Sequence, residues 1–273
     1  FPSAFVKGWG FLDGAEYILT VLAKLRGSDI GDPTAWDALN TVTAQIEPDG
    51  GVAIAKQLVY IIVLKQWTTE VYYDAANSTG SPLGAVQGAK ASFGCVSADS
   101  VQTVDDTLLW IATTRSASPQ VVMMSGLKVD VISTAAVDKL LAAWDYTTIY
   151  SWQLKLDGHN FYVITSKVSN MTLVYDLKEH LWWQMTDSSG NYFPIVSSTY
   201  NSSMQHLLQH ETNGKVYFAS RSYVNDDGAQ ITVDLCPPQF DGGVDRRKML
   251  GMMRILADRQ VGSELLLRVN DHD

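Results

Sequence analysis

Residues 57–74, which read Gln57-Leu-Val-Tyr-Ile-Ile-Val-Leu-Lys-Gln-Trp-Thr-Thr-Glu-Val-Tyr-Tyr-Asp74, contain the pattern that decides the fold. The apolar run from Leu58 to Leu64 has the length of a buried strand, and Thr69–Asp74 carries the β-branched and aromatic residues that fit a pleated surface. The apolar run is also far shorter than the roughly 18–20 residues that a membrane helix needs. This stretch therefore predicts two consecutive strands, and we expect no membrane insertion.

Strand-length runs of the same kind recur along the chain, at residues 14–21, 100–111, 120–132, 149–156, 160–165, 172–177, 192–196 and 215–220. Pairs of residues that favour tight turns stand between them: Asp13-Gly14, Asp49-Gly50, Gly158-His159, Asn213-Gly214 and Asp227-Gly228. Asp-Gly and Asn-Gly are strong hairpin signals, because both central residues of a type I′ turn need a positive φ. The pattern predicts an antiparallel, all-β protein.

A weak internal repeat indicates how the strands are grouped. Units of a strand, a turn and two further strands recur at spacings of roughly 45–55 residues, close to the length of one four-stranded propeller blade. The units begin near Ala4, Ala53, Ser97, Ile149 and Met204, and a last one opens near Ile231. Because each unit is expected to bury one face only against its neighbours, we predict a β-propeller of about five to six four-stranded antiparallel blades, in a complete or an incomplete ring. A β-sandwich or barrel is the alternative.

One segment departs from this pattern. Residues 133–144 place Val137, Leu140, Leu141 and Trp144 on one helical face, and Ser133 or Thr134 is suited to be the N-cap. We therefore predict one short inserted helix near residues 134–144, packed on the rim of the propeller. A weaker helix is expected over residues 33–39, because proline is favoured at a first helical position.

Composition limits the function classes. Twenty Lys and Arg residues stand against 29 Asp and Glu residues, which gives a formal net charge of −9. This balance argues against a protein that holds nucleic acid by neutralising phosphates. Cys95 and Cys236 match no metal-ligand spacing. The first residue is Phe1, and the end of the sequence shows no closing element, so we interpret residues 1–273 as a single domain from a longer chain.

Candidate metal sites are weak in this sequence. His206 and His210 are spaced as in a zinc helix, but the segment reads as a strand and lacks the glutamate of that motif, so a surface or edge pair is favoured. Asp226-Asp-Gly228 lacks the alternating oxygen donors of a calcium loop and predicts a hairpin turn. No nucleotide-binding, acyl-transfer or CxxC motif occurs. We therefore expect no cofactor and no metal.

Two further segments are candidates for a functional role. Residues 28–36 resemble the Asp-box turn of propeller glycosidases, but Ile30 stands where an aspartate is needed, so a structural turn with Trp36 plugged into the core is favoured. Arg246, Arg247 and Lys248 form the one basic cluster, and strand geometry would alternate their side chains between two faces. We interpret them as candidate subunit or channel contacts. Most tryptophans are expected to fill gaps between blades, although exposed ones could bind sugars.

Several short sequence segments together resemble one protein family. They are Gly10-Phe-Leu-Asp-Gly14, residues 27–40, Ala44-Gln-Ile-Glu-Pro-Asp-Gly50, Thr69-Glu-Val-Tyr-Tyr-Asp74, Gly94-Cys95 followed by Ser100, Ser133-Thr134, Gly158-His-Asn-Phe-Tyr162, Thr172-Leu-Val-Tyr-Asp-Leu177 with Trp182-Trp183, and Asp241-Gly-Gly-Val-Asp-Arg-Arg-Lys248. In order and spacing they are similar to the tail nozzle, or packaged-DNA stabilisation, proteins of short-tailed bacteriophages.

The resemblance implies a non-enzymatic virion protein. Such a protein would be one propeller-based subunit of a ring, with six copies, that closes the portal channel, retains packaged DNA and conducts it during ejection. Its partners would be other tail and portal-adaptor proteins, DNA would pass without sequence-specific binding, and synthesis would take place in the cytoplasm of the bacterial host. The alternative is a carbohydrate-active or carbohydrate-binding propeller, either a sialidase-like glycosidase or a receptor-binding lectin.

Overall fold

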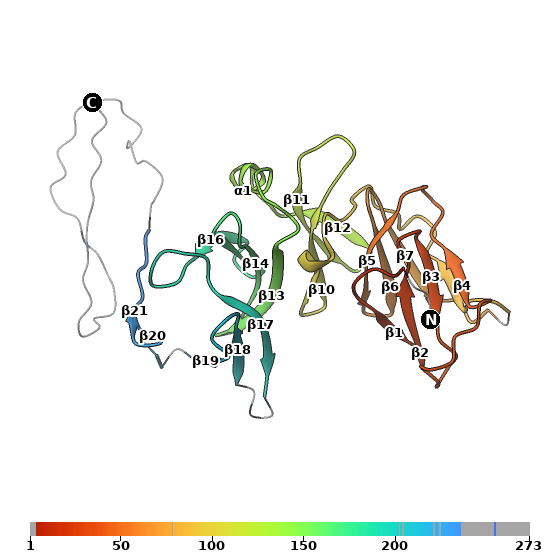
Figure 1. Cartoon of the computed structure of the whole chain (residues 1–273). Coiled ribbons are helices and arrows are strands. Elements are labelled where there is room, and N and C mark those ends of the chain that lie inside the picture. The colour runs from red at the N-terminus through yellow and green to blue at the C-terminus, as the bar shows by residue number, and fades with distance from the viewer. Residues whose placement is uncertain are drawn as a thin grey trace. The chain divides into compact units, whose positions relative to one another are not determined.

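The computed structural model describes residues 4–77, 79–201, 203, 205–220, 222, 223, 225–235 and 254. Contacts within the chain divide it into two units, Phe1–Thr232 and Val233–Asp273. All strands of the described residues lie in the first unit (Figure 1). The interpretation of residues 1–273 as a single domain stays a prediction.

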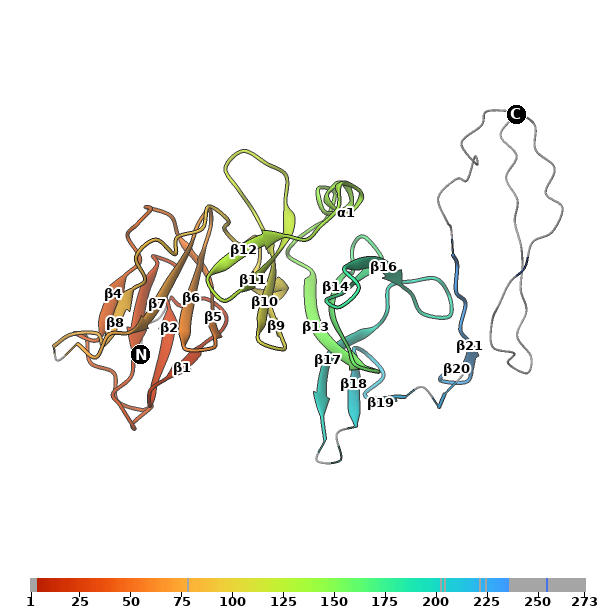
Figure 2. The ribbon, with the colours of Figure 1, turned by 180° about the vertical axis from the view of Figure 1, so that it is seen from behind.

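The described strands form four four-stranded sheets, one three-stranded sheet and one two-stranded hairpin, each in chain order and antiparallel (Figures 1 and 2). The first sheet contains β1 (Gly10–Leu12), β2 (Ala15–Leu19), β3 (Lys24–Gly27) and β4 (Thr41–Thr43), and the second contains β5 (Gly51–Gln57), β6 (Tyr60–Lys65), β7 (Thr69–Asp74) and β8 (Leu83–Ala85). The third contains β9 (Gln102–Val104), β10 (Thr107–Ala112), β11 (Gln120–Ser125) and β12 (Lys128–Val131). The fourth contains β13 (Ile149–Leu156), β14 (His159–Ser166), β15 (Met171–Asp176) and β16 (Leu181–Met185). The fifth contains β17 (Ile195–Tyr200), β18 (His206–His210) and β19 (Val216–Ala219), and β20 (Asn225–Asp226) pairs with β21 (Ala229–Gln230).

The hydrophobic core lies between successive sheets, as in a propeller. In the second sheet, Ile61 and Val63 pack with residues of the first sheet, whereas Ile62 and Leu64 pack with residues of the third. Successive side chains of a strand point to opposite faces, so a strand that is covered on both faces needs apolar residues at every position. This explains the unbroken run that decides the fold. The expectation that each unit buries one face only is wrong for this sheet.

The same alternation continues in the third and fourth sheets. Leu108 and Trp110 of β10 face the second sheet, and Leu109 and Ile111 pack with the fourth. In β14, Tyr162 and Ile164 pack with the third sheet, and Val163 packs with the fifth. Contacts between sheets run through the first strands, because β1 touches β5 and β13 touches both β9 and β17. The all-β propeller class is confirmed.

The inserted helix α1 (Ala135–Leu141) begins at the N-cap Thr134, whose hydroxyl accepts a hydrogen bond from the backbone N–H of Val137 at 3.4 Å. Val137, Leu141 and Trp144 join the core between the third and fourth sheets. Leu140 is 37 % exposed and does not belong to this buried face. The helix is therefore confirmed, but it ends before residue 144.

The second expected helix, over residues 33–39, is wrong. Residues 33 and 34 form a turn in which the Asp32 carboxylate accepts hydrogen bonds from the backbone and the hydroxyl of Thr34, and the Trp36 indole donates to the carbonyl of Pro33. These side chain to backbone contacts compete with helical hydrogen bonds. A short 3₁₀ turn, η1 (Ala98–Ser100), was not expected from the sequence.

The tight turns follow the predicted chemistry in part. Asp13 and Gly14 have φ of 48° and 85°, and Asp227 and Gly228 have φ of 45° and 89°, as a type I′ hairpin requires. The turn predicted at Gly158-His159 is formed one residue earlier, by Asp157 and Gly158. Asp49-Gly50 is not a hairpin, because these residues connect the first sheet to the second.

Candidate functional site: a buried ion cluster and an acidic turn face

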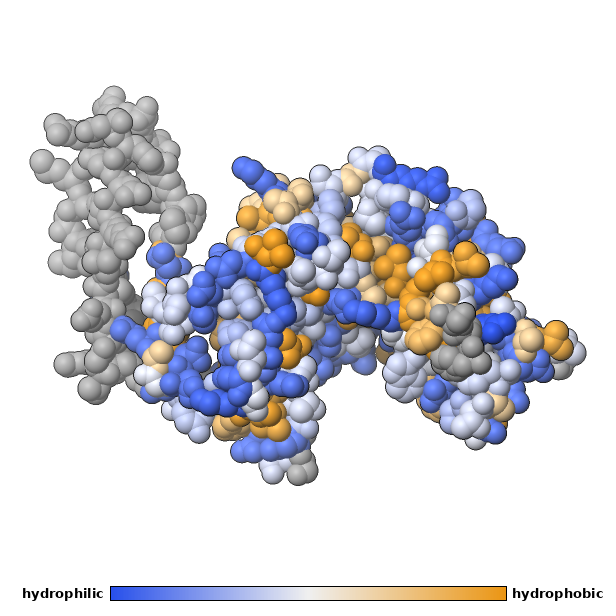
Figure 3. All heavy atoms as spheres, viewed as in Figure 1, coloured by the Kyte–Doolittle hydropathy of each residue, from blue (hydrophilic) through white to orange (hydrophobic). Residues whose placement is uncertain are grey.

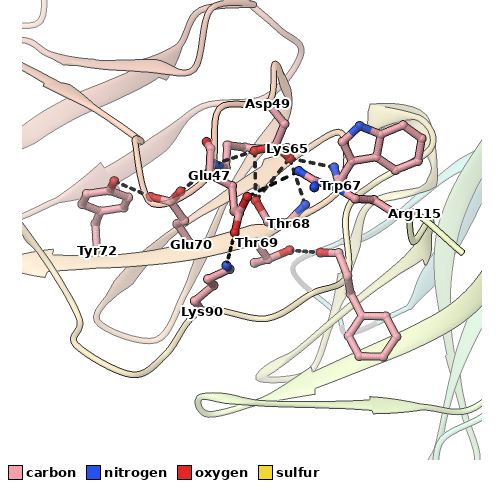
Figure 4. A network of polar contacts seen from close by, with 11 residues as sticks. Glu47, Asp49, Lys65, Trp67, Thr68, Thr69, Glu70, Tyr72, Lys90 and Arg115 are labelled. Carbon is pink, nitrogen blue, oxygen red and sulfur yellow. Dashed lines mark hydrogen bonds and ion pairs between the residues drawn. The ribbon is translucent and has the colours of Figure 1, made fainter.

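A cluster of three buried charges lies in the second sheet (Figure 4). The Lys65 ammonium, at the end of β6, is 2.7 Å from Asp49 Oδ1 and 2.6 Å from Glu70 Oε1. Asp49 belongs to the connection between the first and second sheets, and Glu70 belongs to β7. The side chains of Lys65 and Glu70 are 0 % exposed and that of Asp49 is 2 % exposed. Solvent therefore does not screen these charges.

Each member of the ion cluster has further polar partners. Lys65 donates to the carbonyl of Glu47 at 2.8 Å, and Glu70 Oε2 accepts from the Tyr72 hydroxyl at 2.9 Å. Asp49 Oδ2 accepts from the backbone N–H groups of Trp67 at 2.8 Å and Thr68 at 3.0 Å. Buried charges are tolerated when they are paired and hydrogen-bonded in this way. The cluster thus fixes the inter-sheet connection to the turn after β6.

These contacts also set the protonation state of Asp49. Burial by itself would raise the pKa of this carboxyl, but the hydrogen bonds from Lys65, the Trp67 backbone and Thr68, together with the Lys65 charge, outweigh burial and lower it. Asp49 is therefore ionised whenever the chain is folded near neutral pH.

A second, more exposed group of charges adjoins the cluster (Figure 4). The carboxylate of Glu47 is 2.6 Å from Lys90, which follows the second sheet, and 3.4 Å from Arg115, which lies between β10 and β11 of the third sheet. The hydrogen bond and charge of Lys90 lower the pKa of Glu47. Since these side chains remain 29–62 % exposed, their pairs contribute little to stability compared with the buried cluster.

The cluster does not have the arrangement of a glycosidase site. Such a site needs an accessible pair of carboxyl groups, one of them with a raised pKa. Asp49 and Glu70 share one lysine, are covered from solvent, and the pKa of Asp49 is lowered. The nearby cavity of about 460 Å³ is lined by Gln66, Trp67, Tyr146 and neighbouring residues, and neither carboxylate reaches it. This geometry supports a structural role.

A second feature arises from the topology. In an antiparallel meander, the turn between the first and second strands and the turn between the third and fourth strands lie at the same end of the sheet. These turns carry a series of exposed acidic side chains: Asp13, Asp29, Asp32, Asp37, Asp105, Asp106, Asp157 and Glu179. Lys178 is the one Lys or Arg among the described residues of the same turns. We call this series the acidic turn face.

Contacts between sheets show that these turns share one end of the first unit. Gln57, before the turn of the second sheet, donates to the carbonyl of Asp106 in the third at 3.0 Å. Lys155 of the fourth sheet lies 3.3 Å from Asp105, and its backbone N–H donates to His206 of the fifth at 3.2 Å. Asp13 and Asp74 line a common cavity between the first and second sheets. Lys155 and Lys128, which stand in strands beside these turns, each pair with an aspartate.

The structure also places the residues that the sequence had singled out. Arg246, Arg247 and Lys248 lie outside the described residues. His206 and His210 share β18, but His206 is 3 % exposed and contacts Tyr200, so it is not the surface histidine that was expected. Asp227 forms the predicted hairpin turn and lies 3.1 Å from Lys215. Among the described residues, no group of three or more His, Cys, Asp and Glu side chains could hold a metal ion.

Residues 28–36 form the structural turn that was favoured over an Asp-box. The Ser28 hydroxyl accepts from the backbone N–H of Glu16 at 2.9 Å, and Asp29 accepts from Asn40. Trp36 is half-buried and does not belong to any core cluster, so its expected position as a core plug is wrong. Its indole donates a hydrogen bond to the carbonyl of Pro33 within the same turn.

The tryptophans divide into two groups. Trp110, Trp144 and Trp152 are 0 %, 6 % and 2 % exposed and fill the spaces between sheets as predicted. Trp182 packs in the core between the third and fourth sheets and donates to the carbonyl of Ile132, whereas its neighbour Trp183 is 38 % exposed. The strand alternation therefore sends two adjacent tryptophans to opposite faces.

The ion cluster was missed by sequence reasoning, although the sequence contains a signal for it. Lys65 follows the apolar run directly, and Glu70 stands between residues that read as a buried strand. A charged residue inside a strand that is covered on both faces must find a partner. The position of Asp49 as that partner depends on contacts between sheets and is not visible in the pattern.

Comparison with known proteins identifies the family of this chain. Residues 13–231 match the family described as "Bacteriophage P22 Gp10, beta-propeller", a phage tail and DNA-stabilisation family. The chain belongs to this family. No curated protein matches. No helix in the described part of the chain has the length and hydropathy to span a bilayer.

A search of solved structures matches the β-propeller domain of Cps50 (Swd1) from Myceliophteria thermophila, with 10% identity, a TM-score of 0.40, and 77% of this chain and 65% of that one covered. The computationally designed protein Ika8 has 12% identity and a TM-score of 0.42, with 78% and 57% covered. BamB from Moraxella catarrhalis has 12% identity and a TM-score of 0.39, with 79% and 61% covered. The chain spans less than two thirds of the length of each.

Three of the sequence segments that resemble the phage family lie together at the ion cluster. Residues 44–50 contain Asp49, and residues 69–74 contain Glu70 and Tyr72. The backbone of Gly94 packs so closely that a Cβ there would lie 2.2 Å from the carbonyl oxygen of Gln66. A larger residue at position 94 would therefore displace the turn that binds Asp49.

We expect Lys65→Met to lower the free energy of unfolding by about 3–5 kcal/mol, because two buried carboxylates lose their counter-ion. The matched control Lys90→Met removes the half-exposed partner of Glu47 and should cost less than about 1 kcal/mol. Urea unfolding followed by tryptophan fluorescence measures both. Equal losses in the two variants would contradict the assignment of the cluster as the main electrostatic support of the second sheet.

The lowered pKa of Asp49 predicts a pH dependence. The folded state favours the ionised carboxyl, so its contribution is present above the ordinary pKa of 3.8 and is lost as pH falls through the lower folded pKa. Asp49→Asn should therefore destabilise strongly at pH 7, and this difference from the unmodified chain should shrink towards pH 3. Urea unfolding across this range measures it, with Asp106→Asn as an exposed control that stays near zero. A constant difference for Asp49→Asn would show that its charge is not what stabilises the fold.

Proposed function

We propose that this chain is a subunit of a phage tail nozzle that closes the portal channel, retains packaged DNA and conducts it during ejection. The observation that carries the proposal is the family match over residues 13–231, which assigns the chain to a phage tail and DNA-stabilisation family and to the virion. Two surface features of the described residues support the role of a DNA conduit. They are the acidic turn face and a patch of exposed apolar side chains.

The acidic turn face supports passage of DNA without binding. Each phosphate that a protein neutralises releases counter-ions and strengthens binding, which raises the barrier to sliding. Exposed carboxylates at the ends of successive sheets repel phosphates instead, and the net charge of −9 has the same sign. In the proposed assembly, the acidic turn face lies towards the DNA path.

A patch of exposed apolar side chains supports association with further copies of the chain. Leu22 is 73 % exposed, Ile46 is 49 % exposed and Val21 is 47 % exposed. The connection after β4 runs beside the β2–β3 turn, because Ala44 N–H donates to the carbonyl of Ala23 and Gly51 N–H to that of Val21. Figure 3 shows hydrophobic side chains gathered in the region of the first sheet. Apolar patches of this kind mark protein contacts.

In this proposal the protein acts through shape and summed charge and is not an enzyme. It forms a ring, with six copies as the family resemblance implies, and contacts portal-adaptor and other tail proteins. It is made in the bacterial cytoplasm and needs no cofactor. The carboxylates of the ion cluster, which are the strongest candidates for chemistry in the described residues, are occupied by Lys65.

Assembly tests the proposal. Negative-stain microscopy and light scattering should show rings of the chain, alone or with portal and tail partners, and Leu22→Asp should shift them to monomers. Val168→Asp introduces the same charge at a position that is 66 % exposed in the turn between β14 and β15, and it should leave the rings intact. A chain that stays monomeric with every partner would refute the nozzle role, and equal behaviour of the two variants would refute the patch.

Charge reversal tests the conduit. Virions that carry Asp106→Lys and Glu179→Lys should eject DNA more slowly at low salt and recover as salt rises, because the new lysines attract phosphates. The control Asp130→Lys places the same charge on β12, outside the acidic turn face. Ejection is followed by dye binding to released DNA. Unchanged kinetics, or equal slowing by the control, would show that the acidic turn face lies away from the DNA.

A further inference from the structure

An aromatic surface lies on the outer part of the fourth sheet, on the face that points towards the fifth. It consists of His159, Phe161, Asp176, Leu181 and Trp183, and we call it the blade-four surface. The register places Phe161 opposite Asp176, Asp176 opposite Leu181, and Trp183 opposite Val174. Residues that stand opposite each other in a sheet share one face. These side chains are therefore neighbours on one side of the sheet.

The fifth sheet covers the inner part of this face and leaves the outer strand open. Ile195 and Leu208 pack with Trp152, Leu154, Val163 and Val174, which are all buried. By contrast, Trp183 is 38 % exposed and Leu181 is 59 % exposed on β16, the edge strand of the fourth sheet (Figure 2). The fifth sheet has three strands among the described residues, whereas the fourth has four. Among the described residues, an apolar and aromatic surface is thus left exposed.

Three rings of this surface are held against one another. His159 and Phe161 stack with centroids 5.9 Å apart and planes 11° apart, and Phe161 meets Trp183 edge to face at 5.5 Å and 74°. Such pairs prefer these offset and T-shaped arrangements and restrict each other's rotation. The rings therefore form a preorganised platform, which costs less entropy on binding than mobile side chains would.

The platform carries an oriented polar group. His159 Nδ1 is 2.6 Å from Asp176 Oδ2, and Asp176 Oδ1 accepts from the backbone N–H of Lys178 at 2.8 Å. Burial would raise the pKa of Asp176, but the hydrogen bonds from His159, Lys178 and Glu179 lower it, so the carboxylate stays charged. With Nδ1 held in this way, Nε2 is the ring nitrogen left for a ligand on the 27 % exposed imidazole.

We propose that the blade-four surface binds a neutral hexopyranose saccharide. One face of a pyranose ring presents weakly positive C–H groups, which match the negative face of an aromatic ring, and its hydroxyls suit an oriented imidazole. Sites that combine aromatic lining with a few placed polar groups are typical of small-ligand recognition. Asp157 and Glu179 flank the surface in the adjoining turns and disfavour acidic sugars. This inference does not depend on the nozzle role.

The test uses three probes, maltohexaose, cellohexaose and trigalacturonate. Saturation-transfer NMR and titration of tryptophan fluorescence should detect at least one neutral hexasaccharide and no comparable binding of trigalacturonate. Trp183→Ala should weaken the affinity for the neutral saccharide about tenfold, as loss of one stacking contact implies. The matched control Trp9→Ala removes an indole that is 61 % exposed on the first-sheet side and should leave the affinity unchanged.

A second variant separates recognition from folding. His159→Ala removes the polar group and one ring of the platform while Trp183 stays in place, and it should also weaken binding. Circular dichroism and thermal unfolding confirm that each variant is folded before it is titrated. Three results would overturn the proposal: no binding of either neutral saccharide, binding that survives Trp183→Ala, or equal binding of trigalacturonate. Binding that survives Trp183→Ala would place the saccharide elsewhere on the protein, and equal binding of trigalacturonate would show non-specific adhesion.

Discussion

The packing of the second sheet between its two neighbours is the constraint on which the rest of the structure depends. Since Ile61 and Val63 are buried on one side and Ile62 and Leu64 on the other, β6 has no face that water reaches. A charge at the end of such a strand loses its hydration and must be compensated within the protein. Lys65 is compensated by Asp49 from the inter-sheet connection and by Glu70 from β7, so the ion cluster is a consequence of two-sided burial.

The ion cluster brings together sequence segments that lie far apart in the chain. Asp49 accepts from the backbone of Trp67 and Thr68, and Gly94 lies against Gln66 at a distance that no side chain would allow. The loops that follow the first and second sheets are thereby held to the single turn between β6 and β7. A buried ion pair of this kind specifies one arrangement more than it adds net stability, because alternative packings leave a charge without its partner.

The sequence predicts the position of a strand or turn where local residue preferences determine it. It does not predict features that depend on contacts between sheets. β13 has the predicted bounds of residues 149–156, and the hairpin at Asp13-Gly14 has the expected positive φ values. Residues 100–111 and 120–132 were each expected to be one strand, but each contains two strands. The pattern did not predict the turns at Asp105 and Gly126, because neither turn contains an Asp-Gly or Asn-Gly pair. The ion cluster and the acidic turn face are products of topology, which periodicity does not encode.

Strand alternation also determines where this protein can interact with its surroundings. In β16 it packs the half-buried Trp182 against the core between the third and fourth sheets and exposes Trp183 on the opposite face, although the two residues are chemically identical. The antiparallel meander gathers the acidic turns at one end of the sheets, while the carboxylates of Asp49 and Glu70 are enclosed with Lys65. The enclosed charges hold the inter-sheet connection in one arrangement, whereas the exposed charges and rings stay accessible to solvent.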